Sequence, residues 1–289
     1  MITEKELLDT IFDRLAEDGP RLVYADWLEE EGESERAEII RVQTAILRDG
    51  MYENGKWRSL ADSERVKMQV RSRELENLHL DKWFTGHPNL RELLRQNPVR
   101  IIWDRGFIRY LKLYHIYHDL TFHLPDNLCV IDVIDLYNTP IRTLPQGLRV
   151  GGLLRLTYTN IHTLPDNLHC GSIDLSQTQF STLPAGFRVV RDLHLEHTPT
   201  ARLPKKLSVG GSLYLSHTPI RTLPDDLRID RNLYLSGTQI TARAARNILE
   251  NMPFLSDQAR TTGLRSAGFA SLARQAERRA AQRRIEGRT

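Results

Sequence analysis

The sequence predicts an α/β protein in which a helical N-terminal module leads into a repeat solenoid with a parallel β-sheet and a helical C-terminal cap. Three observations carry this prediction. The dipeptide Leu-Pro returns every 19 or 20 residues, helical spacing of apolar residues fills the first 50 residues, and helical spacing returns after Ile240. We divide the chain into a helical module at 1–50, a helical linker at 51–109, a solenoid of about seven strands at 110–240, and a helical cap with a basic tail at 241–289.

The first 50 residues are predicted to form three helices. Apolar residues recur at helical spacing from Leu7 to Leu15, Pro20 breaks the pattern, and two further helical segments follow. Asp26 and the acidic run at 29–31 have no histidine nearby. We therefore interpret them as a solvated helix end and not as a metal or acid–base site.

The segment from Pro20 to Gln43 contains Arg-Leu-Val-Tyr-Ala-Asp-Trp-Leu-Glu-Glu, followed by Arg-Ala-Glu-Ile-Ile-Arg-Val-Gln. It resembles the bacterial repeat-companion domain found near the N-terminus of large planctomycete proteins. Arg105-Gly106-Phe107 is similar to the short element that leads into the repeats of that family. The resemblance implies an architecture and a lineage, and it carries no chemistry.

Three sequence features recur along the repeats with the same spacing of 19 or 20 residues. Leu-Pro stands at 124, 144, 164, 183, 203 and 223, a threonine stands at 139, 159, 178, 198, 218 and 238, and an apolar-x-Leu pair precedes each threonine. Leucines alternate with serine and tyrosine in 212–216, which predicts a short strand, and Pro219 ends it because proline cannot donate to a strand ladder. Each repeat has an apolar side that only stacked neighbours can cover, so the repeats share one continuous core.

The repeat resembles the short bacterial leucine-rich repeat, whose pattern is L-x-x-L-x-L-x-x-N-x-L. The strand leucines match, whereas Gly151, Gly210 and Asp230 replace the first leucine and a threonine replaces the asparagine throughout. In that family the asparagine satisfies backbone groups of the adjoining loop as a ladder, and we expect the threonine hydroxyl to do part of this. The glycine pairs that begin at Gly151 and Gly210 are expected to ease a tight approach to the strand.

Both ends of the solenoid need caps. Residues 110–113 alternate as a first, irregular strand, and Thr241 is a candidate N-cap for a helix that closes the other end. Residues 258–285 then predict a second, arginine-rich helix or a frayed tail.

Composition points to a cytoplasmic protein without a membrane segment. No apolar run approaches the roughly 18 residues that a membrane helix needs, and no secretory signal is recognised at the N-terminus. Cys129 and Cys170 lie two repeats apart, roughly 10 Å along the solenoid, so we expect two free thiols, with Cys170 in the core. No cofactor is predicted.

The net charge of +3 hides an asymmetry between the two ends. Residues 1–50 contain 6 Lys/Arg against 14 Asp/Glu, a net charge of −8, and residues 241–289 contain 10 Arg against 4 Asp/Glu, a net charge of +6. Such a dipolar chain binds its own kind, binds two different partners, or simply has two solvated helical faces.

We expect a non-catalytic scaffold that binds an unidentified protein or peptide through the concave face of the solenoid, where side chains between the strand leucines project. The candidate residues are Asp135, Tyr137, Arg155, Tyr158, Asp174, His194, Glu196, His197, Tyr214, His217 and Tyr234. The alternative is nucleic-acid binding through an arginine-rich C-terminal helix. Its arginines are Arg274, Arg278, Arg279, Arg283 and Arg284.

Other chemistries find little support. His194, His197 and His217 form the best metal candidate, but zinc needs three or four converging ligands and we predict no metal. A second group in the first cap contains His115, His118, Asp119 and His123. The repeats also resemble those of effector ubiquitin ligases, which carry a catalytic cysteine after the repeats; both cysteines here lie inside them, so we predict no enzyme.

Overall fold

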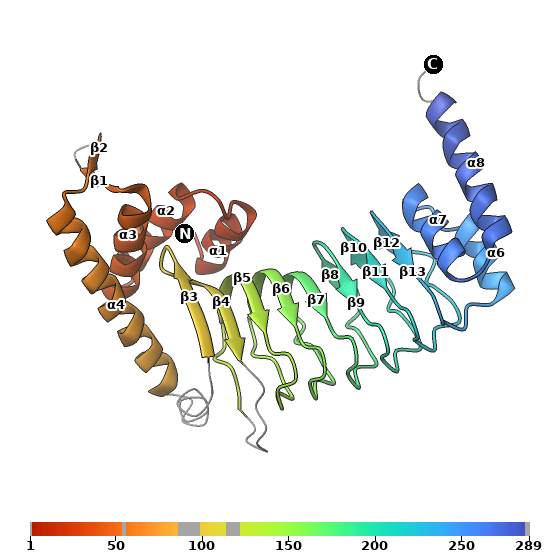
Figure 1. The fold of residues 1–289 in the computed structure, drawn as a ribbon, viewed down its shortest axis with the longest axis horizontal. Helices are drawn as coiled ribbons and strands as arrows, with labels where there is room; N and C mark the ends of the chain where they lie inside the picture. Colours follow the sequence, from red (N-terminus) through yellow and green to blue (C-terminus); the bar gives the residue numbers. More distant parts are fainter. Residues whose placement is uncertain (1, 54–55, 86–98, 114–121, 287–289) are drawn as a thin grey trace.

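The computed structural model describes residues 2–53, 56–85, 99–113 and 122–286. Figure 1 shows an elongated molecule in which a helical module, a mostly parallel β-solenoid of about six turns and a group of helices follow one another. The predicted α/β class and this order of parts are confirmed. Within the described ranges, none of the helices combines the length and the apolar character that crossing a bilayer requires.

Three helices form the N-terminal module, as the apolar spacing predicts. They are α1 (Glu4–Asp13), α2 (Gly19–Glu30) and α3 (Ser34–Arg48). Thr3 caps α1 by accepting a hydrogen bond from the N–H of Glu6, and the Glu6 side chain in turn accepts one from the N–H of Thr3. Pro20 lies in the first turn of α2, where a missing N–H costs no helical hydrogen bond, so it marks a helix start.

The region 51–109 differs from the expected helical linker. It contains one long helix, α4 (Asp62–Thr85), and residues of two antiparallel hairpins, β1 (Gly50–Glu53) with β2 (Lys56–Ser59) and β3 (Val99–Asp104) with β4 (Phe107–Leu113). The second hairpin turns at Arg105 and Gly106, whose φ angles of 49° and 78° are both positive, as a tight two-residue hairpin turn requires. The solenoid sheet therefore begins at β3, before the irregular strand expected at 110–113.

Two sheets run along the solenoid (Figure 1). The larger has eight strands in the order β13-β11-β9-β7-β6-β5-β4-β3, parallel except for the β3–β4 pair, and the smaller has the order β12-β10-β8. The remaining strands are β5 (Cys129–Asp135), β6 (Arg149–Arg155), β7 (His169–Asp174), β8 (Arg188–Val189), β9 (Leu193–His194), β10 (Ser208–Val209), β11 (Leu213–Tyr214), β12 (Arg228–Ile229) and β13 (Leu233–Tyr234). Each of the later coils contributes two short strands, one to each sheet.

Each coil closes on a threonine, which is buried in every coil except the last, where Thr238 is half-buried. The six repeat threonines donate their hydroxyl hydrogen bond to the carbonyl of the leucine three residues earlier, over 2.6–2.8 Å. Thr218, for example, is buried and donates to the carbonyl of Leu215. The threonine hydroxyl does satisfy a backbone group, as expected, but this bond lies within one coil and does not run from coil to coil.

The corner between the two strand segments of a coil requires glycine in the places that the sequence suggests. A Cβ on Gly151 would lie 2.2 Å from the carbonyl oxygen of Ile131, and one on Gly210 would lie 2.3 Å from that of Val190. Neither distance leaves room for a side chain. Successive coils therefore approach each other backbone to backbone at this corner, as we expected.

Three helices cover the C-terminal end: α6 (Ala242–Glu250), α7 (Asp257–Ser266) and α8 (Ala270–Glu286). Thr241 caps α6 by accepting a hydrogen bond from the N–H of Ala244, which confirms the candidate N-cap. The segment 258–285 forms two helices, and not the single helix or frayed tail that we expected. Gly263 of α7 brings that helix directly onto β13, because a Cβ there would lie 2.8 Å from a methyl carbon of Leu233.

The N-terminal module is anchored on the first strands of the solenoid by the β3–β4 turn. Gly106 fits against α3 so closely that a Cβ would lie 2.2 Å from Cγ1 of Ile40, and its N–H donates to Oε1 of Gln43 over 2.7 Å. The next residue, Phe107, stacks on the buried ring of Tyr24 with centroids 5.9 Å apart. The turn is thus the packing surface that joins the two parts.

A buried ion-pair network reinforces this junction. Arg105 donates to the carboxylates of Asp18 and Asp104, each over 2.8 Å, and Arg48 also donates to Asp18. Burial opposes ionisation of Asp18, but the hydrogen bonds from Arg105 and Arg48 outweigh it and lower the pKa of the carboxyl. Asp18 is therefore ionised when the N-terminal module is packed on the solenoid.

Candidate binding surface and interface cavity

Seven outward side chains form one row across the eight-stranded sheet. They occupy matching positions of neighbouring parallel strands, so each follows the previous one in direct register. We call them the sheet-face row: Lys112, Asp135, Arg155, Asp174, His194, Tyr214 and Tyr234. All but Lys112 are among the candidates named from the sequence. The strand spacing of about 4.8 Å makes the row a continuous stripe.

The first half of the row is charged. Asp135 is buried between Lys112, whose Nζ lies 2.9 Å from its carboxylate, and Arg155, whose guanidinium lies 3.7 Å away. The Arg155 guanidinium also lies over the ring of Tyr137, 4.6 Å from the centroid, and that ring meets Tyr158 edge-on at 5.7 Å. Alternating charges thus hold the side chains of this half in fixed positions.

Asp174 links the two halves of the row. One carboxylate oxygen accepts a hydrogen bond from the hydroxyl of Thr157 over 2.9 Å, and the other accepts the backbone N–H of Ser176 over 2.9 Å. The hydroxyl of Ser176 then donates to Glu196 over 2.9 Å. Hydrogen bonds therefore run from the charged half to the aromatic half.

The second half of the row is a stack of rings. His194 lies 4.0 Å from Tyr214 with an interplanar angle of 7°, and Tyr214 lies 4.7 Å from Tyr234 with an angle of 13°. Because the rings stack on one another, the faces between them are covered by their neighbours. This arrangement suits hydrogen bonding and edge contacts better than stacking of a sugar or a base on a ring face.

His194 is held by a carboxylate. Its Nδ1 lies 3.4 Å from Oε2 of Glu196. Burial opposes protonation of the imidazole, but the hydrogen bond and charge of Glu196 outweigh it and raise the pKa of His194 above its ordinary value. The row therefore gains positive charge as the pH falls toward the ordinary histidine range.

The remaining candidates lie at the corner that follows the strands. His197 and His217 stack with centroids 4.6 Å apart, and both adopt positive φ angles, as does the exposed Tyr158. In the described part of the chain no three His, Cys, Asp or Glu side chains converge as metal ligands. His123 contacts the hydroxyl of Thr143, and the other members of that group, His115, His118 and Asp119, lie outside the described residues.

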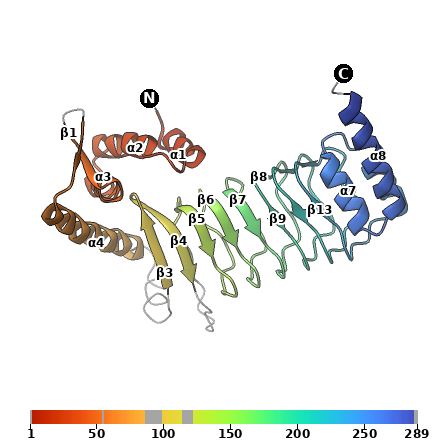
Figure 2. The same cartoon turned by 45° about the horizontal axis from the view of Figure 1, so that its top comes forward.

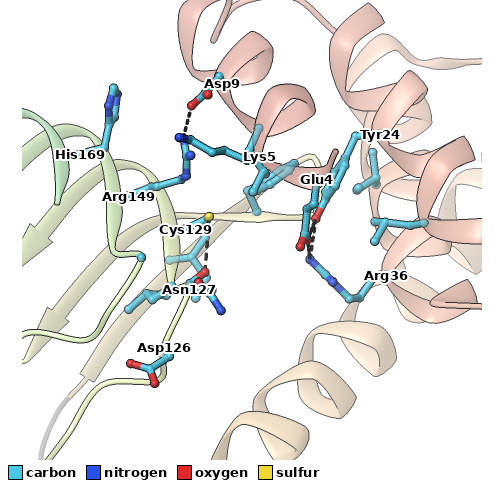
Figure 3. Close-up of a pocket in the computed structure, with 18 of the residues that line it drawn as sticks. Glu4, Lys5, Asp9, Tyr24, Arg36, Asp126, Asn127, Cys129, Arg149 and His169 are labelled. Atoms are coloured by element: carbon cyan, nitrogen blue, oxygen red, sulfur yellow. Dashed lines mark hydrogen bonds and ion pairs between the residues drawn. The ribbon is translucent and has the colours of Figure 1, made fainter. Parts of the chain in front are cut away.

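Sequence reasoning missed a large cavity between the N-terminal module and the solenoid (Figure 3). It has a volume of about 1310 Å³ and is bounded by α1–α4 on one side and by residues of β3–β8 with their turns on the other. Its polar lining includes Glu4, Lys5, Asp9, Arg36, Asp126 and Arg149. The cavity forms only where the N-terminal module packs on the solenoid, so no local sequence motif predicts it.

Ion pairs and hydrogen bonds organise part of the cavity lining. Figure 3 shows Arg149 reaching across to Asp9, and Tyr24 donating to Glu4 over 2.6 Å while it accepts from Arg36 over 2.7 Å. These contacts join α1 both to its own module and to β6. They hold the two walls together.

Cys129 and His169 also line the cavity, but they stand two coils apart, which is roughly 10 Å at the usual strand spacing. Burial raises the pKa of the Cys129 thiol to about 12, and burial raises that of Cys170 to about 12 as well. Both cysteines are free, as expected. Neither has the thiolate character that a nucleophile needs.

At both charged ends of the molecule the charged side chains lie at the surface. Asp26 and Glu29 both pair with Arg41, over 2.9 and 2.8 Å, which agrees with a solvated helix end. On α8 the five arginines are exposed, whereas a stripe of buried alanines faces the protein.

No protein-family model, no curated protein and no solved structure matches this chain.

Proposed function

We propose that the chain is a non-catalytic scaffold that binds a protein or peptide across the outer face of its eight-stranded sheet. The observation that carries the proposal is the sheet-face row, in which seven polar and aromatic side chains stand in register on consecutive strands. A leucine-rich-repeat lineage, a repeat-companion module and a cytoplasmic setting are part of the same proposal. Free thiols at Cys129 and Cys170 favour a reducing compartment.

The geometry favours an extended polypeptide that lies along the solenoid axis and crosses the strands. Its side chains would meet charges in the first half of the row and a stack of aromatic rings in the second. The row is already ordered by Asp135, Asp174 and Glu196, so binding costs little side-chain entropy. Aromatic and arginine side chains are also the residues that most often dominate binding energy at protein interfaces.

Photo-crosslinking tests this proposal. A photoreactive phenylalanine analogue replaces Tyr214 in one variant and Arg142 in another, because Arg142 is exposed but lies outside the row. In a lysate we expect adducts to one or a few polypeptides from position 214 and a much weaker set from position 142. An Arg155→Glu, Tyr234→Ser double variant should remove those adducts while Arg142→Glu, Arg202→Glu retains them. Equal adducts from both positions, or adducts that survive in the row variant, refute the sheet-face role.

Nucleic-acid binding through α8 is the alternative, and it receives less support. At about 100° per residue, Arg274 and Arg278 lie on one side of α8, and Arg279 and Arg283 lie about 140° further round. Arg283 also pairs with Asp257. A gel shift with random DNA and RNA at low salt tests the alternative, since phosphate contacts are strongest there.

A further inference from the structure

The two helical ends of the molecule rise on the same side of the solenoid. Both Figure 1 and Figure 2 show α1–α3 at one end and α8 at the other, and in Figure 1 the strands β8, β10 and β12 lie along the same edge of the solenoid between them. The acidic end, defined as α1–α3, belongs to a segment of net charge −8, and the basic end, defined as α6–α8, belongs to a segment of net charge +6. The solenoid holds these opposite charges apart within one chain.

Unpaired charges remain at both ends. Among the described residues, Glu30, Glu31 and Glu33 have no ion-pair partner at the acidic end. At the basic end the same holds for the exposed arginines Arg274, Arg278 and Arg284. Each end therefore offers charge to a partner without breaking a bond inside the chain.

Apolar side chains accompany the charges. At the acidic end Val23 is 54% exposed and Leu47 is 61% exposed. At the basic end Phe254 is 44% exposed with the guanidinium of Arg228 over its ring at 4.3 Å, and Ile285 is 69% exposed. Both ends thus carry exposed apolar side chains as well as charge, and an interface uses the first for affinity and the second for steering.

We propose that the partner of these two surfaces is a second copy of this chain, in an antiparallel dimer related by a two-fold axis. Because both ends rise on one side, a single rotation places the acidic end of each copy against the basic end of the other. A two-fold contact is closed, so every surface is used once and no filament grows. The proposal is independent of the sheet-face role.

Charge swapping in the full chain, followed by sedimentation velocity, tests the dimer. The wild type is expected to be dimeric at about 0.05 M salt and to dissociate toward 1 M salt, where screening acts over about 3 Å. Reversing the charges of the unpaired glutamates (Glu30→Lys, Glu31→Lys, Glu33→Lys) changes the net charge of residues 1–50 from −8 to −2 and should weaken self-association about tenfold or more. Reversing the basic end (Arg274→Glu, Arg278→Glu, Arg284→Glu) should do the same, whereas Arg142→Glu, Arg202→Glu should not.

An equal mixture of the two reversed variants distinguishes this dimer from other occupants. One variant carries three lysines in place of the unpaired glutamates, and the other carries three glutamates in place of the unpaired arginines. In the mixture these substituted patches have opposite charge and the unchanged ends still complement each other, so a heterodimer should form at low salt. A wild type that is monomeric at low salt, a mixture that stays monomeric, or a ladder of species larger than the dimer each overturns the proposal. If the wild type is monomeric and shifts random nucleic acid in a gel through its basic end, the partner of that end is nucleic acid.

Discussion

The hydroxyl oxygen of Thr262 accepts a hydrogen bond from the backbone N–H of Leu233 over 3.0 Å, and one turn later Ser266 does the same for Leu235 over 2.9 Å. Residues four apart on a helix rise about 6 Å, and alternate residues of a strand advance about 6.6 Å. The two spacings match closely enough for α7 to take the place of a further coil. Its side chains satisfy the open edge of β13, which would otherwise offer unpaired N–H groups to another chain.

Removing these hydroxyls should loosen the last coil. In a Thr262→Val, Ser266→Ala double variant the N–H groups of Leu233 and Leu235 lose their acceptors, at a cost of about 1–3 kcal/mol each if they stay buried. Hydrogen exchange at these two amides should accelerate, while exchange at Leu193 and Leu195 in the middle of the solenoid should not change, because each coil is stabilised mainly by its neighbours. Uniform acceleration along the whole solenoid would contradict a local cap.

Substitution of Gly106 should detach the N-terminal module. Gly106→Ala places a Cβ 2.2 Å from Ile40 at a φ angle of +78°, so it combines a clash with backbone strain. Gly186→Ala is the matched control, since Gly186 has a φ angle of +70° but open space around its Cβ position. Limited proteolysis should cut the module from the solenoid readily in the first variant only. Equal sensitivity in both variants would mean that strain, and not packing on Ile40, is responsible.

The hydroxyl of a repeat threonine should matter more than its methyl group. Thr218→Val removes the 2.6 Å hydrogen bond to the carbonyl of Leu215, which keeps only the backbone N–H of Thr218 at 3.2 Å, and we expect a loss of about 1 kcal/mol in the free energy of unfolding. Thr218→Ser keeps the hydroxyl and should lose clearly less. Chemical denaturation of both variants measures the difference, and a Ser variant as unstable as the Val variant would refute the role of the hydroxyl.

Docking of the module should weaken in acid through Asp18. Its pKa is lowered in the folded protein, so its contribution to stability is present above the unfolded pKa of about 4 and is lost as the pH falls through the lower folded value. Asp18→Asn should therefore destabilise the junction at pH 7 by about 3 kcal/mol and flatten the loss of stability below about pH 4. Asp26→Asn, whose carboxylate is 72% exposed, serves as the control and should change both much less. Thermal unfolding across this pH range measures the effect, and an acid limb of unchanged slope in Asp18→Asn would count against it.

The repeat period and the apolar alternation predicted the solenoid and most of the sheet-face row. The position of every strand leucine follows from one short, regular pattern. The register of Asp174, His194 and Tyr214 therefore follows from counting residues from those leucines. The pairings of those side chains do not follow from counting. The hydrogen bonds from Thr157 to Asp174 and the stacking of His194 on Tyr214 depend on rotamers that only the packed coils define.

The parts that sequence reasoning missed all depend on contacts between distant segments. Val99, Ile101, Ile102 and Trp103 have high strand propensity, but the antiparallel pairing of 99–104 with β4 depends on a turn at Gly106 that packs on α3 and on Phe107, which packs on Tyr24 of α2. The cavity beside Arg149 likewise exists only because α1 lies over β6. A repeat fixes the order of its own coils, whereas docking geometry is encoded in single, non-repeating residues.

The independence of the two caps makes the solenoid extensible. The N-terminal module contacts the first coils, through Asp9 on Arg149 and Phe12 on His169, and α7 bonds to the last coil through Thr262 and Ser266. Duplication of one 20-residue coil in the middle would therefore leave both junctions intact and add one position to the row, about 4.8 Å long. The number of coils would then set the length of the sheet-face row. Gene duplication could change that length one coil at a time without altering either end of the molecule.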